Sequence, residues 1–300
     1  MARTRDVVVG VVIAVVFLGA IGFFGLMIAG MLAESGEFRF AGLGGNIGLV
    51  EVYGTIDEEM GRPIIDLLDE WKDNSGIRAI VLHVNSPGGG VAISQEIYDA
   101  VKRARDVKPV VASMASVCAS GGYYIACAAD RVVANPGSLT GSIGVIFQFY
   151  TAGKLMEKVG IETETVKSGE LKDVGSLGRA MTEEERLMLR SVVMDTYEQF
   201  VQAVADGRGL DPEQIYPLAD GSIFTGLQAL NLHLVDTLGG LNEAIQVAAD
   251  LADLEGTPRV VRPVKRRQIS VFDLLGGLLR ATQTDLVREM SGPELLYLYR

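Results

Sequence analysis

The sequence contains few of the residues on which disulfide frameworks and most metal sites depend. Among its 300 residues there are two cysteines and two histidines. Cys118 and Cys127 stand nine positions apart in apolar surroundings, so we expect buried free thiols rather than a disulfide. Because the sequence also lacks a Walker motif and any cluster of histidines and cysteines, it predicts no metal and no nucleotide cofactor.

Positive charge is scarce as well. The chain has 27 lysines and arginines against 38 aspartates and glutamates, which gives a formal net charge of −11. An acidic chain of this kind is a poor ligand for phosphate backbones, so the composition argues against nucleic acid as a partner. The length suits one domain of good size with appendages.

Charge is absent altogether from one long stretch near the start of the chain. Residues 7–32 carry no charged side chain and follow Arg3 and Arg5. A bilayer core needs roughly 20 apolar residues, whereas the apolar part of a cleaved signal sequence has about 7–15. We therefore expect residues 1–32 to be a cytoplasmic N-terminus and an uncleaved transmembrane signal anchor, with the remainder extracytoplasmic. A cleaved signal sequence is the alternative, and the Gly-rich residues 33–46 read as a linker.

Short apolar runs and amphipathic stretches alternate after the linker. This alternation is typical of parallel strands joined by right-handed crossover helices, so the predicted fold class is α/β with a mostly parallel sheet. The predicted strands are residues 47–54, 77–84, 109–114, 131–136, 144–150 and 163–166, and the predicted crossover helices are residues 63–71 and 91–104.

A longer helix is predicted from Thr182. Thr182 and Glu185 have capping-box spacing, and Gly207 or Gly209 would end the helix. A helix of about 25 residues is longer than the typical helix of a globular domain. We expect it to pack across the sheet or against a neighbouring subunit.

The tail, residues 256–300, differs in composition from what precedes it. Its segment RVVRPVKRRQ (259–268) holds five basic residues, and patchy amphipathicity follows. A membrane-surface or partner-docking role and a solvated linker with a packed or frayed helix both fit this pattern.

Two glycine motifs follow predicted strands. In ASGGYY (119–124), Ser120 could simply be a helix N-cap. Gly121 and Gly122 would each cost a helix about 1 kcal/mol relative to alanine, which favours a position where the backbone must approach a ligand. In NSPGGG (85–90), bare amides could face a bound oxygen. Since both motifs end parallel strands, we expect them at the same edge of the sheet.

A nucleophilic serine would need a base. Neither His83, inside a predicted strand, nor His233, on a predicted surface turn, has the surroundings of a Ser-His-Asp triad, although the sequence alone does not exclude His83. Lysine is the other base, because burial lowers the ordinary lysine pKa of about 10.4. Lys172 in KSGELKD (167–173) is the candidate and Lys167 its rival. The alternative is that Lys172 is a solvated loop lysine paired with Asp173.

The order of these motifs resembles the signal peptide peptidase A family in its short single-domain form. The motifs are SPGGG, ASGGYY, LTGSIGV (139–145), SGELKD and LVDTLGG (234–240), and the resemblance covers most of residues 47–250. It implies a Clp/crotonase-like βαβ superhelical fold with an N-terminal transmembrane helix and a peptidase domain over residues 47–255. It also implies a ring-like homo-oligomer.

The resemblance further implies a membrane-anchored serine endopeptidase that hydrolyses remnant signal peptides and other apolar peptides through an acyl-enzyme. Ser120 falls on the nucleophile and Lys172 on the general base, which together form a Ser-Lys dyad. The amides of Gly89 and Gly121 fall on the oxyanion hole, and Ser142 falls on the residue that orients the lysine. Two other functions share the fold: a crotonase-type acyl-CoA enzyme, and a membrane scaffold without catalytic activity.

Overall fold

Three successive βαβ units form the centre of the computed structural model, which describes residues 46–263. The pairs β1–β2, β2–β3 and β3–β4 are all parallel, so the predicted α/β fold class with its parallel crossovers is confirmed. The elements are β1 (Asn46–Tyr53), α2 (Glu58–Asp73), β2 (Ile77–Ser86), α3 (Val91–Arg105), β3 (Val110–Ala119), α4 (Gly121–Ala126) and β4 (Arg131–Ala134).

The described strands form one eight-stranded sheet in the order β6-β5-β3-β2-β1-β8, with β4 beside β3 and β7 beside β4. Strand β3 divides, because its first half pairs with β4 and its last three residues pair with β5. Strand β8 lies parallel to β1, so residues 259–261, which were predicted to be part of the tail, belong to the sheet edge. The added strands are β5 (Leu139–Gly141), β6 (Ile223–Thr225), β7 (Thr237–Leu238) and β8 (Arg259–Val261).

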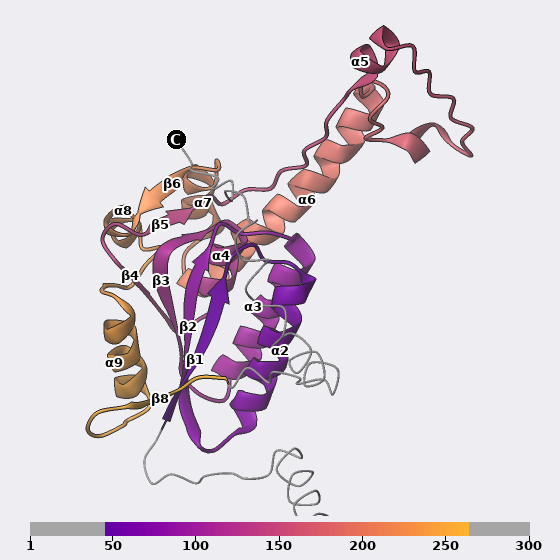
Figure 1. The fold of residues 1–300 in the computed structure, drawn as a ribbon. Helices are drawn as coiled ribbons and strands as arrows, with labels where there is room; N and C mark the ends of the chain where they lie inside the picture. The colour runs from indigo at the N-terminus through magenta and orange to yellow at the C-terminus, as the bar shows by residue number, and fades with distance from the viewer. Residues whose placement is uncertain (1–45, 264–300) are drawn as a thin grey trace, which may run out of the picture. The chain divides into compact units, whose positions relative to one another are not determined.

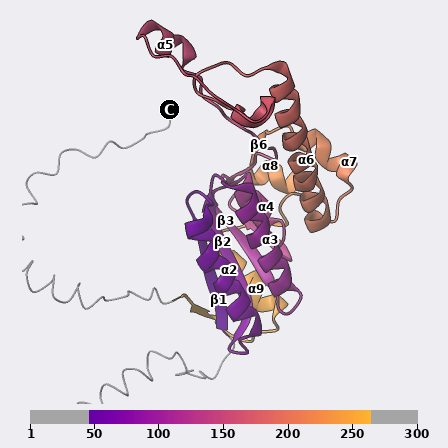
Figure 2. The same ribbon diagram turned by 90° about the vertical axis from the view of Figure 1, so that its right-hand side faces the viewer.

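Helices cover both faces of the sheet, as fully apolar strands require. Figure 1 shows α9 (Leu241–Leu251) on one side of the strands and α2 and α3 on the other, and Figure 2 views the α2–α3–α4 side. Small side chains such as Ala244 and Ala248 let α9 lie close to the sheet. The opposite face carries the larger core, in which Leu68, Ile97 and Tyr123 are fully or almost fully buried.

Helix α6 (Glu183–Arg208) confirms the helix predicted from Thr182. The Thr182 hydroxyl accepts a hydrogen bond from the Glu185 amide, and the helix ends at Gly209 in the left-handed conformation. Apart from Glu185, only the C-terminal part of this 26-residue helix is buried. Its N-terminal half extends away from the sheet towards α5 (Gly153–Lys158), as Figure 1 shows. Other helices among the described residues are α7 (Pro212–Ile215), η2 (Tyr216–Leu218) and α8 (Gly226–Asn231).

Two predicted strands are wrong. Residues 163–166 and all but the first residue of 144–150 belong to what we call the arm, residues 145–182 between β5 and α6, and neither segment is a strand. Their apolar side chains do not enter the core: Ile146 is 84% exposed, Phe147 57% and Val166 96%. An apolar run predicts that a segment will be buried, but it does not indicate whether the same chain or another chain buries it.

Both cysteines are buried and free, as predicted. Burial raises the pKa of each thiol, that of Cys127 to about 12. The predicted anchor, the linker up to residue 45 and the tail from residue 264 lie outside the described residues. Within residues 46–263, none of the helices combines the length and the apolar character that crossing a bilayer demands.

Candidate active site

Ser120 stands at the sharp turn between β3 and α4. Its backbone has φ 52° and ψ −123°, a conformation that a residue other than glycine adopts at a cost of about 1–3 kcal/mol. It occupies the N-cap position of α4, yet among the described residues its side chain caps no helix amide. The N-cap explanation therefore does not account for Ser120. Strain of this kind at a strand-to-helix turn is typical of an exposed nucleophile.

Backbone hydrogen bonds fix this turn. The Ser120 amide donates to the carbonyl of Gly141 at 2.8 Å, and the Ser120 carbonyl accepts from the amide of Tyr124 at 2.9 Å. Both main-chain groups of Ser120 are thus satisfied by the end of β5 and the first turn of α4. Ser120 also lines a small cavity.

The glycine loop after β2 lies against Ser120. The Ile56 amide donates to the Gly88 carbonyl at 2.9 Å, and the Ile56 carbonyl accepts from the Gly90 amide at 2.8 Å. In a parallel bridge of this kind the residue between, Gly89, directs its own N–H away from Ile56.

The Gly89 amide lies close to the backbone of Gly121. A Cβ atom built on Gly121 would lie 3.3 Å from the Gly89 nitrogen, and one built on Gly88 would lie 3.1 Å from the Ser120 Oγ. The structure thus brings three predicted site residues, Ser120, Gly89 and Gly121, to one point at the carboxyl ends of β2 and β3. Two such amides beside a hydroxyl are the arrangement that an oxyanion hole requires.

A pocket of about 110 Å³ opens beside Ser120. Its walls are largely apolar and come from four segments: Val91 of α3, Tyr124 of α4, Ile146 of the arm and Phe200 of α6. The Tyr124 ring packs against Phe200, with centroids 4.9 Å apart. Tyr124 belongs to the ASGGYY motif, one helical turn after Ser120, but no signal in the sequence indicated Phe200. The pocket suits an apolar side chain of moderate size.

Ser142 lies next to the serine turn. The last residue of β5, Gly141, pairs with Ala119 and accepts the hydrogen bond from Ser120, so Ser142 follows directly. Its amide donates to the Ser222 carbonyl at 2.7 Å, and its φ of 51° nearly equals that of Ser120. The structure therefore places this fourth predicted residue at the same edge of the sheet.

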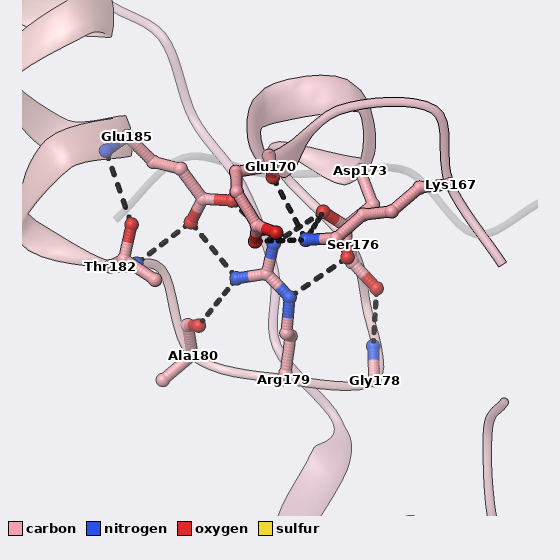
Figure 3. Close-up of polar contacts among 9 residues, drawn as sticks. All are labelled: Lys167, Glu170, Asp173, Ser176, Gly178, Arg179, Ala180, Thr182 and Glu185. Atoms are coloured by element: carbon pink, nitrogen blue, oxygen red, sulfur yellow. Dashed lines mark hydrogen bonds and ion pairs between the residues drawn. The ribbon is translucent and has the colours of Figure 1, made fainter. Parts of the chain in front are cut away.

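Lys172 is the predicted site residue that the single chain does not bring to Ser120. It lies in η1 (Glu170–Asp173) of the arm, is exposed, and does not line the pocket. Figure 3 shows that side chains around η1 connect it to Glu185 in the first turn of α6. The pocket instead meets α6 at Thr196 and Phe200. Eleven residues of helix separate Glu185 from Thr196, a rise of about 16 Å.

The expected partner of Lys172 is taken by other groups. Asp173 accepts from Lys167 at 3.0 Å and from Arg179 at 2.7 Å. In the part of the chain that the structure describes, the Lys172 ammonium pairs with no carboxylate, so the Lys172–Asp173 pair is wrong. The hydrogen bond to Asp173 raises the pKa of Lys167. A raised pKa favours the charged form, which makes Lys167 a poor base.

The histidines lie elsewhere. His83 Nδ1 is 3.1 Å from Ser113 Oγ, and Ser113 precedes Ser120 by seven residues of β3, on the order of 20 Å. His233 is exposed on the turn after α8, as predicted. Within residues 46–263, no three His, Cys, Asp or Glu side chains are grouped as metal ligands would be.

Comparisons with known proteins identify the family of the chain. The family model of Peptidase family S49 matches residues 102–255, and that of Clp protease matches residues 46–139. The candidate protease slr0021 of Synechocystis sp. is 42% identical over 209 residues, which are 70% of this chain and 75% of that protein. Protease 4 of Salmonella typhi is 40% identical over 180 residues, 60% of this chain and 29% of that protein.

A candidate signal peptide peptidase, SppA of Enterococcus faecium, is 37% identical over 179 residues, 59% of this chain and 52% of that protein. Among solved structures, a mutant of the membrane-bound stomatin-specific protease 1510-N superposes with a TM-score of 0.51 at 12% identity, over 74% of this chain and 98% of that one. The similarity to this solved structure concerns the fold alone. The family match and the Synechocystis relative together show that the chain belongs to peptidase family S49. The names of its relatives support a serine peptidase.

Proposed function

We propose that the protein is a membrane-anchored serine endopeptidase that hydrolyses remnant signal peptides and other apolar peptides outside the cytoplasm. The observation that carries the proposal is the strained Ser120, which lies against the amides of Gly89 and Gly121 at the mouth of an apolar pocket. The charge-free residues 7–32 support the anchor. The name of the Enterococcus faecium relative supports the substrate class.

The proposed reaction is acyl transfer by a Ser-Lys dyad. Lys172 in its neutral form takes the Ser120 proton as Oγ attacks the peptide carbonyl, and the Gly89 and Gly121 amides donate to the oxyanion. The C–N bond then breaks, and the Lys172 ammonium protonates the leaving amine. In the second half, Lys172 removes a proton from water, which attacks the Ser120 ester. The ammonium returns that proton to Oγ as the acid product leaves. Ser142, beside the turn, orients the lysine amine.

In this proposal Lys172 comes from a second copy of the chain. Within one chain the η1 turn is joined to the far end of α6, about 16 Å of helix from the pocket residue Thr196. A proton transfer needs a heavy-atom distance of about 2.6–3.2 Å. An arm that reaches over the neighbouring copy would supply the missing base, and a ring of such copies would complete every site.

The surface of the arm supports this assembly. A groove of about 660 Å³ runs between the arm and α6, and its apolar lining includes Phe147, Phe149, Leu189 and Val193. Ile146 lines both this groove and the pocket beside Ser120. Exposed apolar side chains grouped in this way support an interface at the groove. A neighbouring copy that covers the groove would therefore also contact the wall of the pocket.

The test is hydrolysis of a fluorogenic apolar peptide by the detergent-solubilised protein from pH 6 to pH 10. We expect wild-type activity to rise with pH as a lysine deprotonates, and Ser120→Ala and Lys172→Met to lose about 10⁴-fold or more in kcat while remaining folded. Ser116→Ala, an exposed serine on β3, is the matched control. An active Lys172→Met variant would contradict the dyad. Absence of turnover and of labelling by a serine-reactive probe would favour the scaffold, and binding of coenzyme A would favour the acyl-CoA enzyme.

A further inference from the structure

Arg179 joins the turn that carries Lys172 to the start of α6. Its Nε donates to Asp173 Oδ2 at 3.0 Å and its Nη2 to Asp173 Oδ1 at 2.7 Å. On the other side its Nη1 donates to Glu185 Oε2 at 2.9 Å, and Nη2 also contacts Glu185 Oε1. Figure 3 shows the guanidinium between the two carboxylates. Such forked contacts set direction as well as distance, because the guanidinium is planar.

Glu185 is a firm anchor for this contact. Its side chain is 1% exposed, in a half of α6 that is otherwise not buried. It accepts from the Thr182 amide at 2.7 Å and completes the capping box. Hydrogen bonds from Arg179 and from the Thr182 amide lower the pKa of Glu185 to about 2, so it stays charged. The helix therefore offers Arg179 a fixed carboxylate.

Asp173 is the other end of the connection, and it is the residue next to Lys172. Its side chain is 15% exposed and also accepts from Lys167. The backbone around it forms a tight turn, with the Lys172 amide donating to the Gly169 carbonyl at 3.1 Å and the Ser176 amide to the Asp173 carbonyl at 3.0 Å. When Asp173 is held, the backbone from which the Lys172 side chain extends is held as well.

We propose that Arg179 is a positioning residue, whose guanidinium links Asp173 to Glu185 and so holds η1 where Lys172 reaches the Ser120 of a neighbouring copy. This inference rests on the proposed dyad. The capping box of α6 is complete without Arg179, so the helix does not need the contact in order to start. The turn does need it, because a base displaced by about 1 Å costs on the order of 10² in rate.

The experiment compares kcat and KM for the apolar peptide in Arg179→Ala, Arg179→Lys and the control Arg103→Ala. Arg103 is an exposed arginine of α3 that makes a forked contact with Asp69 of α2, away from the arm. We expect Arg179→Ala to lower kcat about 10- to 100-fold with KM unchanged, because no residue that lines the pocket lies between residues 167 and 185. Arg179→Lys should recover only part of the rate, because an ammonium lacks the planar set of donors with which the guanidinium contacts both Asp173 and Glu185. Millimolar guanidinium chloride should restore activity to Arg179→Ala, whereas the same concentration of sodium chloride should not. Arg103→Ala should behave as wild type.

Two further variants keep the outcomes distinct. Glu185→Gln preserves the capping box but removes the charge that faces Arg179, so kcat should fall here too even if Arg179→Ala folds poorly. In a Lys172→Ala background, Arg179→Ala should cause no further loss, because it acts through the lysine. Wild-type kcat in both Arg179→Ala and Glu185→Gln, with Lys172→Ala inactive, overturns this inference and leaves the dyad standing. Wild-type kcat in Lys172→Ala overturns the dyad and the inference together.

Discussion

Ser120 and Lys172 stand on two parts of the chain that are built in different ways. Ser120 follows a strand in the middle of the sheet, and backbone hydrogen bonds to Gly141 and Tyr124 fix its turn. Lys172 stands in the arm, where apolar residues such as Ile146 are exposed and charged side chains hold the turn. The first part completes its geometry within one chain. In the proposed assembly, the second completes its geometry only against another copy.

This difference separates two kinds of catalytic precision. A nucleophile and its oxyanion donors must be fixed relative to one another within about 0.5 Å, and a packed sheet edge achieves this. A base supplied by another copy is present only after assembly. A peptidase built in this way would be inactive as a single chain, and its activity would depend on the concentration of the assembled form.

The larger expected effect tests the glycine loop beside Ser120, which is packed within one chain. In Gly89→Ala the new Cβ atom would lie 2.1 Å from the Ile56 carbonyl oxygen, so the loop must shift and move its amide away from the oxyanion. We expect kcat to fall about 10²- to 10³-fold with the arm unaffected. Gly137→Ala is the control, since a Cβ atom there meets open space. Equal activity of the two variants, measured with the same peptide, would remove the Gly89 amide from the mechanism.

A smaller expected effect concerns the stability of the arm at acid pH. The pKa values of Glu185 and Asp173 lie below their ordinary range because Arg179 donates to both carboxylates. A depressed carboxyl pKa stabilises the fold above the unfolded value of about 4.3, and this contribution is lost as the pH falls towards the folded value of about 2 for Glu185. We therefore expect pepsin to cut the arm before the sheet as the pH is lowered from about 4 to about 2. Cleavage within the strands first would contradict the account.

The sheet and the serine turn could be predicted from the sequence because their signals are local. Apolar runs between amphipathic stretches indicated the strands, and glycines that a helix would disfavour marked the turn at Ser120. The wall residue Phe200 could not be predicted, because it reaches the pocket from a helix eighty residues further along the chain.

The arm was harder to predict for a physical reason. Residues 144–150 (GVIFQFY) and 163–166 (TETV) are rich in the β-branched and aromatic residues of strands but are not paired as strands in the structure. The predicted ion pair between Lys172 and Asp173 was also wrong. The two residues are adjacent in the sequence, but the turn directs the Asp173 carboxylate to Arg179 and Lys167. In the proposed assembly a second copy covers part of the arm, and the local pattern of apolar residues does not indicate which face it covers.

The most direct test of a dyad shared between copies is a mixing experiment. Ser120→Ala and Lys172→Ala chains carrying different tags are co-expressed, and assemblies that hold both tags are assayed on the apolar peptide. Each variant alone should be inactive. The mixture should recover about a quarter of the wild-type activity per chain, because random assembly places an intact lysine beside an intact serine at one site in about four. A mixture as inactive as its components would show that Ser120 and Lys172 do not act across an interface.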